Sequence, residues 1–327
     1  MKKLTGAAHL DLSGQMQKDL AARVLAAGGV QELRANATTL EEKEWEIVDK
    51  AISNIARPLL VGVNDLRDKP ELVKTIDAMQ STVLAYDKIS DLEEAEITMK
   101  LSQRPRNDRP TYERAYVPLP FFTKFFQLDA RELNMGRKLG TPLDTSAAAA
   151  ASVKVAELAE QVLFRGASSY TAAGGVLYGY CDFPDRNTLS LGTSWVTETG
   201  ENIVLDVISF INASVADNHY GPWMLYVPQA YAGALSKDHK ANSSLTVAER
   251  IRSISGIIDV KVAPKLAADN VVLVEMSPMT IELVMGMDIT NIPWNTETGD
   301  LMHLVAACII PLPKADADGR CGIVHAS

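Results

Sequence analysis

The side chains that most often carry out chemistry in proteins lie far apart in this sequence. Neither the histidines nor the cysteines show the spacing of a metal shell, a catalytic triad or a redox pair. An odd number of cysteines indicates reduced thiols, as in the cytoplasm. We therefore predict no catalytic residue, no metal and no cofactor, although an active site assembled from distant residues would escape this search. The residues concerned are His9, His219, His239, His303, His325, Cys181, Cys308 and Cys321.

Short motifs lead to the same prediction. The chain has no P-loop, no G-x-S-x-G nucleophile elbow and no H-E-x-x-H zinc motif. The glycine-rich stretch 171–180 does not match a dinucleotide fingerprint, and backbone freedom where two lobes meet explains it better. Residues 316–319, DADG, begin like a calcium loop but lack the remaining ligands and the bidentate glutamate.

The composition narrows the possible function classes. The chain has 327 residues, of which 47% are hydrophobic and 22% charged, as in folded proteins with a large core. Its formal net charge of -9 is the wrong sign for tight nucleic-acid binding, which depends on Lys and Arg. No apolar run reaches the ~20 residues that cross a bilayer, so we expect neither a membrane span nor a secretory signal.

The most distinctive local pattern predicts a long hairpin. Alternating apolar and polar residues indicate strands over 94–102 and 111–122, joined by the turn-forming stretch 103–110. An isolated hairpin is marginal in water, and neither flanking segment offers a sheet for it to join. We therefore predict that it packs on a neighbouring subunit. Its expected contact residues are Ile97, Met99, Leu101, Tyr112 and Tyr116, with Arg104, Arg106 and Arg109 at or near the tip.

Three interpretations fit these tip arginines. They could contact nucleic acid, form a solvated turn, or pair with carboxylates of an adjacent subunit. The excess of acidic over basic residues, 41 against 32, favours the third interpretation. Four phenylalanines follow the hairpin, and we expect them to pack its base onto the core rather than to form a ligand cage. They are Phe121, Phe122, Phe125 and Phe126.

Helical periodicity predicts the elements that carry the hairpin. We expect one helix over 39–57, a second over 68–84 and a short one over 128–140. The longest helix should run over about 146–165 and span on the order of 30 Å. The predicted apolar stripes are Leu72, Ile76, Met79 and Val83 on the second helix, and Ala151, Val155, Leu158 and Val162 on the longest.

The second half of the chain has the pattern of an α+β lobe, in which helices and short strands mix. Strands are predicted wherever short runs of β-branched and other apolar residues stand between turn signals. The predicted helices cover 201–218 and 248–256, and the predicted strands cover 223–228, 257–264, 270–277, 280–289 and 303–312.

The stretch from residue 126 to residue 166 resembles one found in encapsulins and in the major capsid proteins of tailed phages. Its two matching ends are separated by the interval typical of those proteins, and further pieces match in order between about residues 60 and 312. The matching residues are Phe126, Leu128, Asp129, Glu132, Leu133, Val155, Ala156, Glu157, Val162, Phe164, Arg165 and Gly166. The further matching segments are 86–99, 117–128, 142–145, 221–228, 248–264 and 272–294.

This resemblance implies the Hong Kong 97-type capsid fold, an α+β fold with an N-terminal arm, an extended-loop β-hairpin, a peripheral domain with a long spine helix, and an axial domain. Val155, Leu158 and Val162 are the residues expected to pack the spine helix. The implied division is an N-terminal arm with a helix (1–58), the start of the peripheral domain (59–85), the extended-loop hairpin (86–120), the peripheral domain with the spine helix (121–175), the axial domain (176–290), and a return to the peripheral domain with a C-terminal tail (291–327).

The function implied is that of a major capsid protein. Such a protein assembles through pentamers and hexamers into an icosahedral shell around double-stranded DNA, without sequence-specific binding. The implied partners are further copies of the chain, a portal, and decoration or separate scaffolding proteins, in a virion capsid assembled in the host bacterial cytoplasm. An encapsulin-type compartment shares this fold, but residues 1–58 do not resemble the encapsulin N-terminus. A two-lobed soluble enzyme is the remote alternative.

Overall fold

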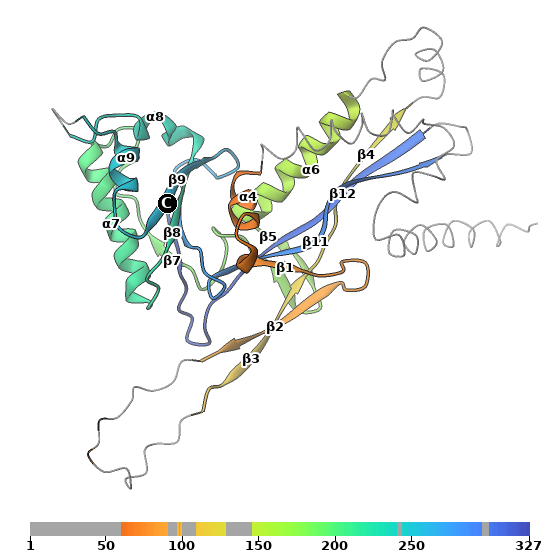
Figure 1. Ribbon diagram of the computed structural model, residues 1–327, viewed down its shortest axis with the longest axis horizontal. Helices are drawn as coiled ribbons and strands as arrows, with labels where there is room; N and C mark the ends of the chain where they lie inside the picture. The colour runs from red at the N-terminus through yellow and green to blue at the C-terminus, as the bar shows by residue number, and fades with distance from the viewer. Residues whose placement is uncertain are drawn as a thin grey trace, which may run out of the picture.

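The computed structural model describes residues 60–90, 97, 99, 109–128, 146–240, 244–295 and 301–327. Within these ranges the chain forms two lobes, and a two-stranded hairpin projects away from both (Figure 1). The helices predicted over 39–57 and 128–140 fall outside the described residues, apart from the first residue of the second.

The first lobe, which we call the peripheral lobe, is built on a four-stranded sheet in the order β1-β11-β12-β4. Strands β11 and β12 form its antiparallel centre, with bulges near Met285 and Met287. Their long runs of apolar residues are buried, as expected for strands covered by helix and loop. The strands are β1 (Val73–Thr75), β4 (Phe122–Leu128), β11 (Ile281–Asn295) and β12 (Leu301–Pro313).

A long helix, α6 (Ser146–Arg165), has the predicted bounds and packs on this sheet alongside β4 and β12 (Figure 1). Its buried face is rich in alanine, which lets the helix axis approach the sheet closely. The helix ends at Arg165. Gly166, the next residue, has a φ of +67°, a conformation that glycine adopts more easily than residues with a Cβ atom. Val155 and Val162 are buried as predicted, whereas Leu158 is 41% exposed and lies on the outer side.

The prediction of a helix over 68–84 is wrong. A short helix, α4 (Val61–Arg67), comes earlier, and the 3-10 turn η2 (Pro70–Leu72) leads directly into β1. Val73 pairs with Leu283 of β11, so sheet pairing overrides the helical spacing of the apolar residues. Met79 of the predicted stripe is exposed, and Val83 begins the hairpin strand β2.

The hairpin consists of β2 (Val83–Ile89) and β3 (Tyr112–Pro118), paired antiparallel from Val83–Pro118 to Ile89–Tyr112. The described part of the ladder therefore begins about ten residues before the strand predicted from the alternation over 94–102. The two strands join no other sheet among the described residues, as predicted. Their base rests on a second small hairpin, β5 (Ala167–Ala172) and β6 (Gly175–Leu177).

Gly175 is required for this contact between the two hairpins. A Cβ atom at Gly175 would lie 2.3 Å from the backbone oxygen of Tyr116, closer than any real carbon contact. The glycine-rich stretch predicted as a flexible lobe junction is thus a close backbone crossing.

The second lobe, which we call the axial lobe, holds a five-stranded sheet in the order β7-β13-β10-β8-β9. Its core gathers large aromatic side chains, with Trp195 stacked on Phe210 and Tyr231. The strands are β7 (Asn187–Leu189), β8 (Trp223–Pro228), β9 (Ile257–Ala263), β10 (Val271–Glu275) and β13 (Ile323–Ala326). The helices are α7 (Gly200–Ala216), η3 (Gln229–Tyr231), α8 (Ala232–Leu235) and α9 (Val247–Arg252).

The two sheets divide the chain differently from the predicted limits at two places. Residues 281–290 of β11 lie in the peripheral sheet, although we predicted that 176–290 forms the axial domain. Strand β13 lies between β7 and β10 in the axial lobe, although we predicted that 291–327 returns to the peripheral domain. Only β12 and the described end of β11 from that range lie in the peripheral sheet. The domain limits themselves remain a prediction.

Candidate functional site

The histidines, cysteines and acidic residues of the described ranges do not assemble a metal site. Among them, no group of three or more His, Cys, Asp and Glu side chains could hold a metal ion. Asp316, the first residue of the DADG stretch, instead accepts hydrogen bonds from the backbone N–H groups of Asp318 and Arg320, which makes a turn. None of the three cysteines forms a disulfide, the thiol of Cys321 donates a hydrogen bond to the backbone oxygen of Lys314 at 3.2 Å, and burial raises the pKa of Cys321 to about 12. No helix in the described ranges is long and apolar enough to cross a membrane.

The projecting hairpin is the first candidate surface. Ile97 and Met99 are fully exposed, and Tyr112 and Tyr116 are exposed on one face of β3. Apolar side chains that gather without cover in one chain usually mark a contact with another molecule. Arg109 is also exposed, whereas Leu101, Arg104 and Arg106 lie outside the described residues.

Two ion pairs lie along the paired strands of this hairpin, and they differ in exposure. Arg114 Nε lies 3.0 Å from Asp87 Oδ1 across the two strands, and Lys88 Nζ lies 2.7 Å from Asp185 Oδ2 of the loop after β6. The first pair is solvent-exposed and adds little free energy, since water screens it. The second pair is less exposed and ties the hairpin to the body of the chain.

A groove of about 500 Å³ lies between the hairpin base and the axial lobe. Its lining combines the exposed apolar side chains of Ile89 and Met279 with charges of both signs. This mixture is typical of protein contact surfaces rather than of anion sites. The charged lining residues are Asp87, Lys88, Asp217, Lys314, Asp316 and Arg320.

The second candidate region lies where the two lobes meet, at a buried carboxylate of the long helix. Glu160 of α6 is fully buried and accepts hydrogen bonds from the N–H groups of Gly62, at 2.6 Å, and Val63, at 3.3 Å. These N–H groups begin α4 and have no partner within that helix. Burial raises the pKa of Glu160 to about 7, although the backbone hydrogen bonds oppose the shift.

The same cluster continues into the axial lobe through Asp65 of α4. Tyr226 of β8 donates its hydroxyl hydrogen to Asp65 Oδ2 at 2.9 Å, and Lys261 of β9 forms an ion pair with Oδ1. Burial raises the pKa of Asp65, while the bond from Lys261 lowers it. Helix α4 is therefore held on one side by the peripheral lobe and on the other by the axial lobe. We call these residues, Glu160, Asp65, Tyr226 and Lys261, the Glu160 junction.

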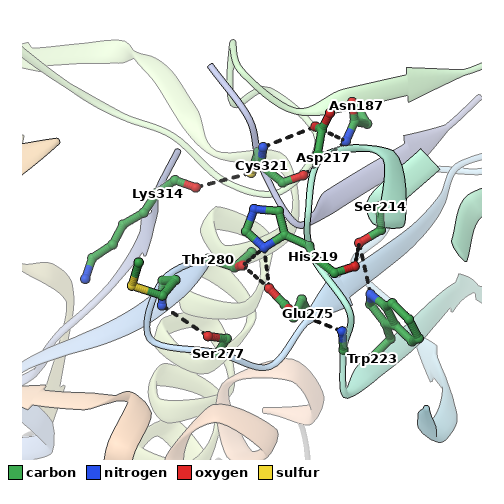
Figure 2. Close-up of polar contacts among 12 residues, drawn as sticks. Asn187, Ser214, Asp217, His219, Trp223, Glu275, Ser277, Thr280, Lys314 and Cys321 are labelled. Carbon is green, nitrogen blue, oxygen red and sulfur yellow. Dashed lines mark hydrogen bonds and ion pairs between the residues drawn. The ribbon is translucent and has the colours of Figure 1, made fainter. Parts of the chain in front are cut away.

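A second polar cluster joins the lobes around Glu275, the last residue of β10 (Figure 2). His219 Nδ1 lies 2.5 Å from Glu275 Oε2, and Thr280 donates to the same oxygen at 2.7 Å. The N–H of Gly221 donates to Oε1 at 3.0 Å. Burial favours the neutral acid, but the bonds from His219 and Thr280 prevail and lower the pKa of Glu275. This His219 junction connects the turn after α7 with the start of β11 in the peripheral sheet.

Close packing beside this junction leaves no space for a side chain at position 322. A Cβ atom at Gly322 would lie 2.6 Å from Thr280 Oγ1 and 2.9 Å from Glu275 Oε2. Nearby, Asp217 accepts hydrogen bonds from the Asn187 side chain at 2.7 Å and from the N–H of Cys321 at 3.3 Å (Figure 2).

The sequence offered a signal for one junction but not for the other. Glu160 interrupts the buried face of α6 between Ala156 and Phe164, and a carboxylate at such a position indicates a buried partner. His219 and Glu275 are 56 residues apart, and no spacing rule connects them.

The four phenylalanines after the hairpin do not act as one group. Phe122 is buried, Phe126 stacks on His303 with ring centroids 4.6 Å apart, and Phe125 meets Trp294 edge to face. Phe121 and Phe125 are exposed. The expectation that all four pack the hairpin base on the core therefore holds for only some of them.

A projecting hairpin, a long helix across a four-stranded sheet and a separate α+β lobe define the Hong Kong 97-type capsid fold. Three solved structures support this class. The virus-like particle from Pyrococcus furiosus matches with a TM-score of 0.60 and 20% identity over 85% of this chain and 98% of its own. The capsid of Myoviridae phage XM1 gives 0.58 and 10% over 75% and 85% of the two chains. The capsid of the native GTA particle gives 0.57 and 11% over 81% and 89%.

The chain belongs to the family of unknown function DUF6260, whose model matches residues 34–326. A curated relative is the type 1 encapsulin shell protein EncA of Myxococcus xanthus (strain DK1622), which is 24% identical over 233 residues, or 71% of each chain. These three solved structures are thus described as a virus-like particle or a capsid, and the curated relative as a shell protein.

Proposed function

We propose that the chain is the major capsid protein of a tailed phage or prophage, and that it assembles through pentamers and hexamers into an icosahedral shell. The observation that carries this proposal is the uncovered hairpin, which displays Ile97, Met99, Tyr112 and Tyr116 on a capsid fold. A shell protein needs such a surface, because the contacts between neighbouring copies bury its apolar side chains.

In the proposed shell each hairpin lies over a neighbouring subunit. Its apolar residues, Leu101 among them, pack on that neighbour, and Arg104, Arg106 and Arg109 pair with its carboxylates. Leu158 of the long helix, exposed in the single chain, is available for a further contact between copies. Repeated contacts between two different surfaces close into rings and then into a shell.

The proposed cargo is double-stranded DNA, enclosed without sequence-specific contacts. The net charge of -9 suits a container whose wall does not hold its contents tightly. The proposed partners are further copies of the chain, a portal, and decoration or separate scaffolding proteins. The proposed location is the virion capsid, which would assemble in the host bacterial cytoplasm. The proposed role is structural rather than enzymatic.

A second candidate function is the shell of an encapsulin-type compartment. The similarity to EncA over 71% of both chains and the fit to the Pyrococcus furiosus particle favour it. The two candidates share a fold and differ in contents: a genome in one, protein cargo in the other.

Electron microscopy of the protein expressed alone tests the shell, and analysis of native particles tests the contents. We expect closed shells of uniform diameter, or free rings of five or six subunits if a scaffold is required. Nuclease-protected genomic DNA inside native particles supports the phage capsid. Protein cargo without DNA supports the compartment, and a small discrete oligomer with neither rings nor shells refutes both.

A further inference from the structure

A second, smaller pocket lies at the base of the hairpin. It measures about 260 Å³, and its walls come from β2 and β3, from β6 and the loop after it, and from the end of β12. Small-molecule sites usually measure about 300–1,000 Å³, so this pocket suits one or two side chains of a bound peptide rather than a cofactor.

Flat rings form most of the apolar wall of this pocket. Tyr86 and Tyr178 are half-buried, and Tyr178 meets Phe183 edge to face with ring centroids 6.0 Å apart. A polyproline II segment has no internal hydrogen bonds and binds by packing its proline rings into grooves lined with aromatic side chains. We call this site the ring pocket, and its ring residues are Tyr86, Tyr178, Phe183, Pro184, Pro311 and Pro313.

Contacts within the chain hold these walls in place before anything binds. The close crossing at Gly175 leaves no space between β6 and the backbone of Tyr116. Lys88 of β2 reaches Asp185 of the loop after β6 at 2.7 Å, and both side chains are mostly buried. A preformed site and a polyproline II segment each lose little conformational entropy on binding, so even a short contact can be specific.

The charges at the pocket leave one carboxylate without a partner. Lys88 and Glu113 lie opposite each other in the β2–β3 ladder, but the ammonium of Lys88 pairs with Asp185. Arg114, the other cation of the lining, pairs with Asp87 at 3.0 Å. Glu113 is exposed and forms no ion pair with any residue that the structure describes. An excess carboxylate attracts a basic side chain, so the ligand should carry Arg or Lys beside its prolines.

We infer that the ring pocket docks a proline-rich segment of a separate protein, with two prolines three residues apart and a basic residue beside them. Polyproline II has three residues per turn, so this spacing puts both prolines on one face. None of the 15 prolines of this chain stands three residues from another. A second copy of the chain therefore lacks the required segment. The inference goes beyond the proposed shell function and does not depend on what the shell contains.

Isothermal titration of the full chain with synthetic peptides tests the ligand. The probe is a short alanine-based peptide with two prolines three residues apart and an arginine directly after the second. The comparison peptide has the same composition, with its prolines four residues apart. The probe should bind at least about tenfold more tightly, because only its prolines share a face. Equal affinities, or no binding of the probe, would overturn the inference.

Variants of the chain test the pocket. Tyr178→Ala should weaken binding of the probe about tenfold, since it removes a ring on which the prolines pack. Tyr170→Ala, at an exposed tyrosine of β5 outside the pocket lining, is the control and should bind like the wild type. Circular dichroism should report the same fold for both. Equal weakening in the two variants would show that the rings of the pocket do not hold the ligand.

Glu113→Gln tests the charge at an exposed position, where folding does not depend on the side chain. The variant should bind the arginine probe about threefold more weakly, because an exposed ion pair is lost. A probe with glutamine in place of arginine should bind the variant and the wild type equally. Equal affinities of the two proteins for the arginine probe would refute the predicted basic residue.

Two further measurements separate this inference from its alternatives. A peptide of residues 102–111, which holds the prolines nearest the hairpin tip, should not bind. If it bound as tightly as the probe, the occupant would be a second copy of the chain. Shells seen by electron microscopy without binding of the probe would overturn only this inference. Binding of the probe to a chain that forms neither shells nor rings would refute only the proposed function.

Discussion

The hairpin and the lobe junctions of this protein use their side chains in opposite ways. In the junctions, Glu160 and Glu275 are buried, and each bonds to several donors within its own chain. On the hairpin, apolar residues such as Ile97 and Met99 meet only solvent in the single chain. The difference indicates that the junctions satisfy their buried polar groups within one chain, whereas the apolar side chains of the hairpin need a neighbouring copy to bury them. Substitutions should therefore affect stability at the junctions and assembly at the hairpin.

The largest loss of stability is expected at the Glu160 junction. Glu160→Ala leaves the N–H groups of Gly62 and Val63 buried without a partner and opens a cavity, which should lower the free energy of unfolding by about 3 kcal/mol. Urea unfolding of the dissociated subunit measures this. Glu160→Gln keeps one acceptor oxygen and should lose less; equal losses in the two variants would contradict the role of the acceptor.

The same residue should give stability a particular dependence on pH. The pKa of Glu160 is raised from 4.5 to about 7 in the folded state, so folding takes up a proton between those values. Its contribution is fully present below the unfolded pKa and is lost as pH rises through the folded pKa. Between pH 4.5 and 7 the wild type should lose about 3 kcal/mol relative to Glu160→Gln, as linkage requires. Parallel stability curves for the two proteins would show that Glu160 does not titrate here.

The His219 junction should give a smaller loss with the opposite dependence on pH. His219→Ala removes one partner of the buried Glu275 and should lower the free energy of unfolding by about 2 kcal/mol near neutral pH. Because the pKa of Glu275 is lowered, its contribution is present above the unfolded pKa and disappears as pH falls through the folded pKa. The variant should therefore approach the wild type in acid. Tyr220→Ala, at the exposed neighbouring position, is the control and should change little.

The smallest effect on stability is expected at the hairpin tip, together with a large effect on assembly. Arg104→Glu, Arg106→Glu and Arg109→Glu combined should leave the thermal midpoint of the subunit unchanged, because a surface charge contributes little within one chain. Shell closure should be impaired, since the reversed charges repel the carboxylates proposed to bind them. Normal shells from the triple variant, seen by electron microscopy, would refute this pairing.

Local sequence patterns predicted some elements well because residues within or next to those elements determine where they begin and end. Helix α6 had its predicted bounds, since the alanine-rich stripe and Gly166 act locally, and β8 began and ended where its apolar run does. The helix over 68–84 failed because Val73 pairs with Leu283, more than two hundred residues away. The junctions also depend on pairs that are distant in the sequence, such as Glu160 with Gly62, which are 98 residues apart. The only signal in the sequence was a carboxylate on the buried face of α6.

The position of β13 has a consequence for how the protein is made. Residues 323–326 lie between β7 and β10, so the axial sheet remains split in two until the ribosome has synthesised the chain as far as residue 326. Such late, long-range pairing makes folding slow and leaves strand edges open in the meantime. A nascent chain that stops short of β13 therefore cannot complete its axial sheet, and defective translation products should be kept out of any particle.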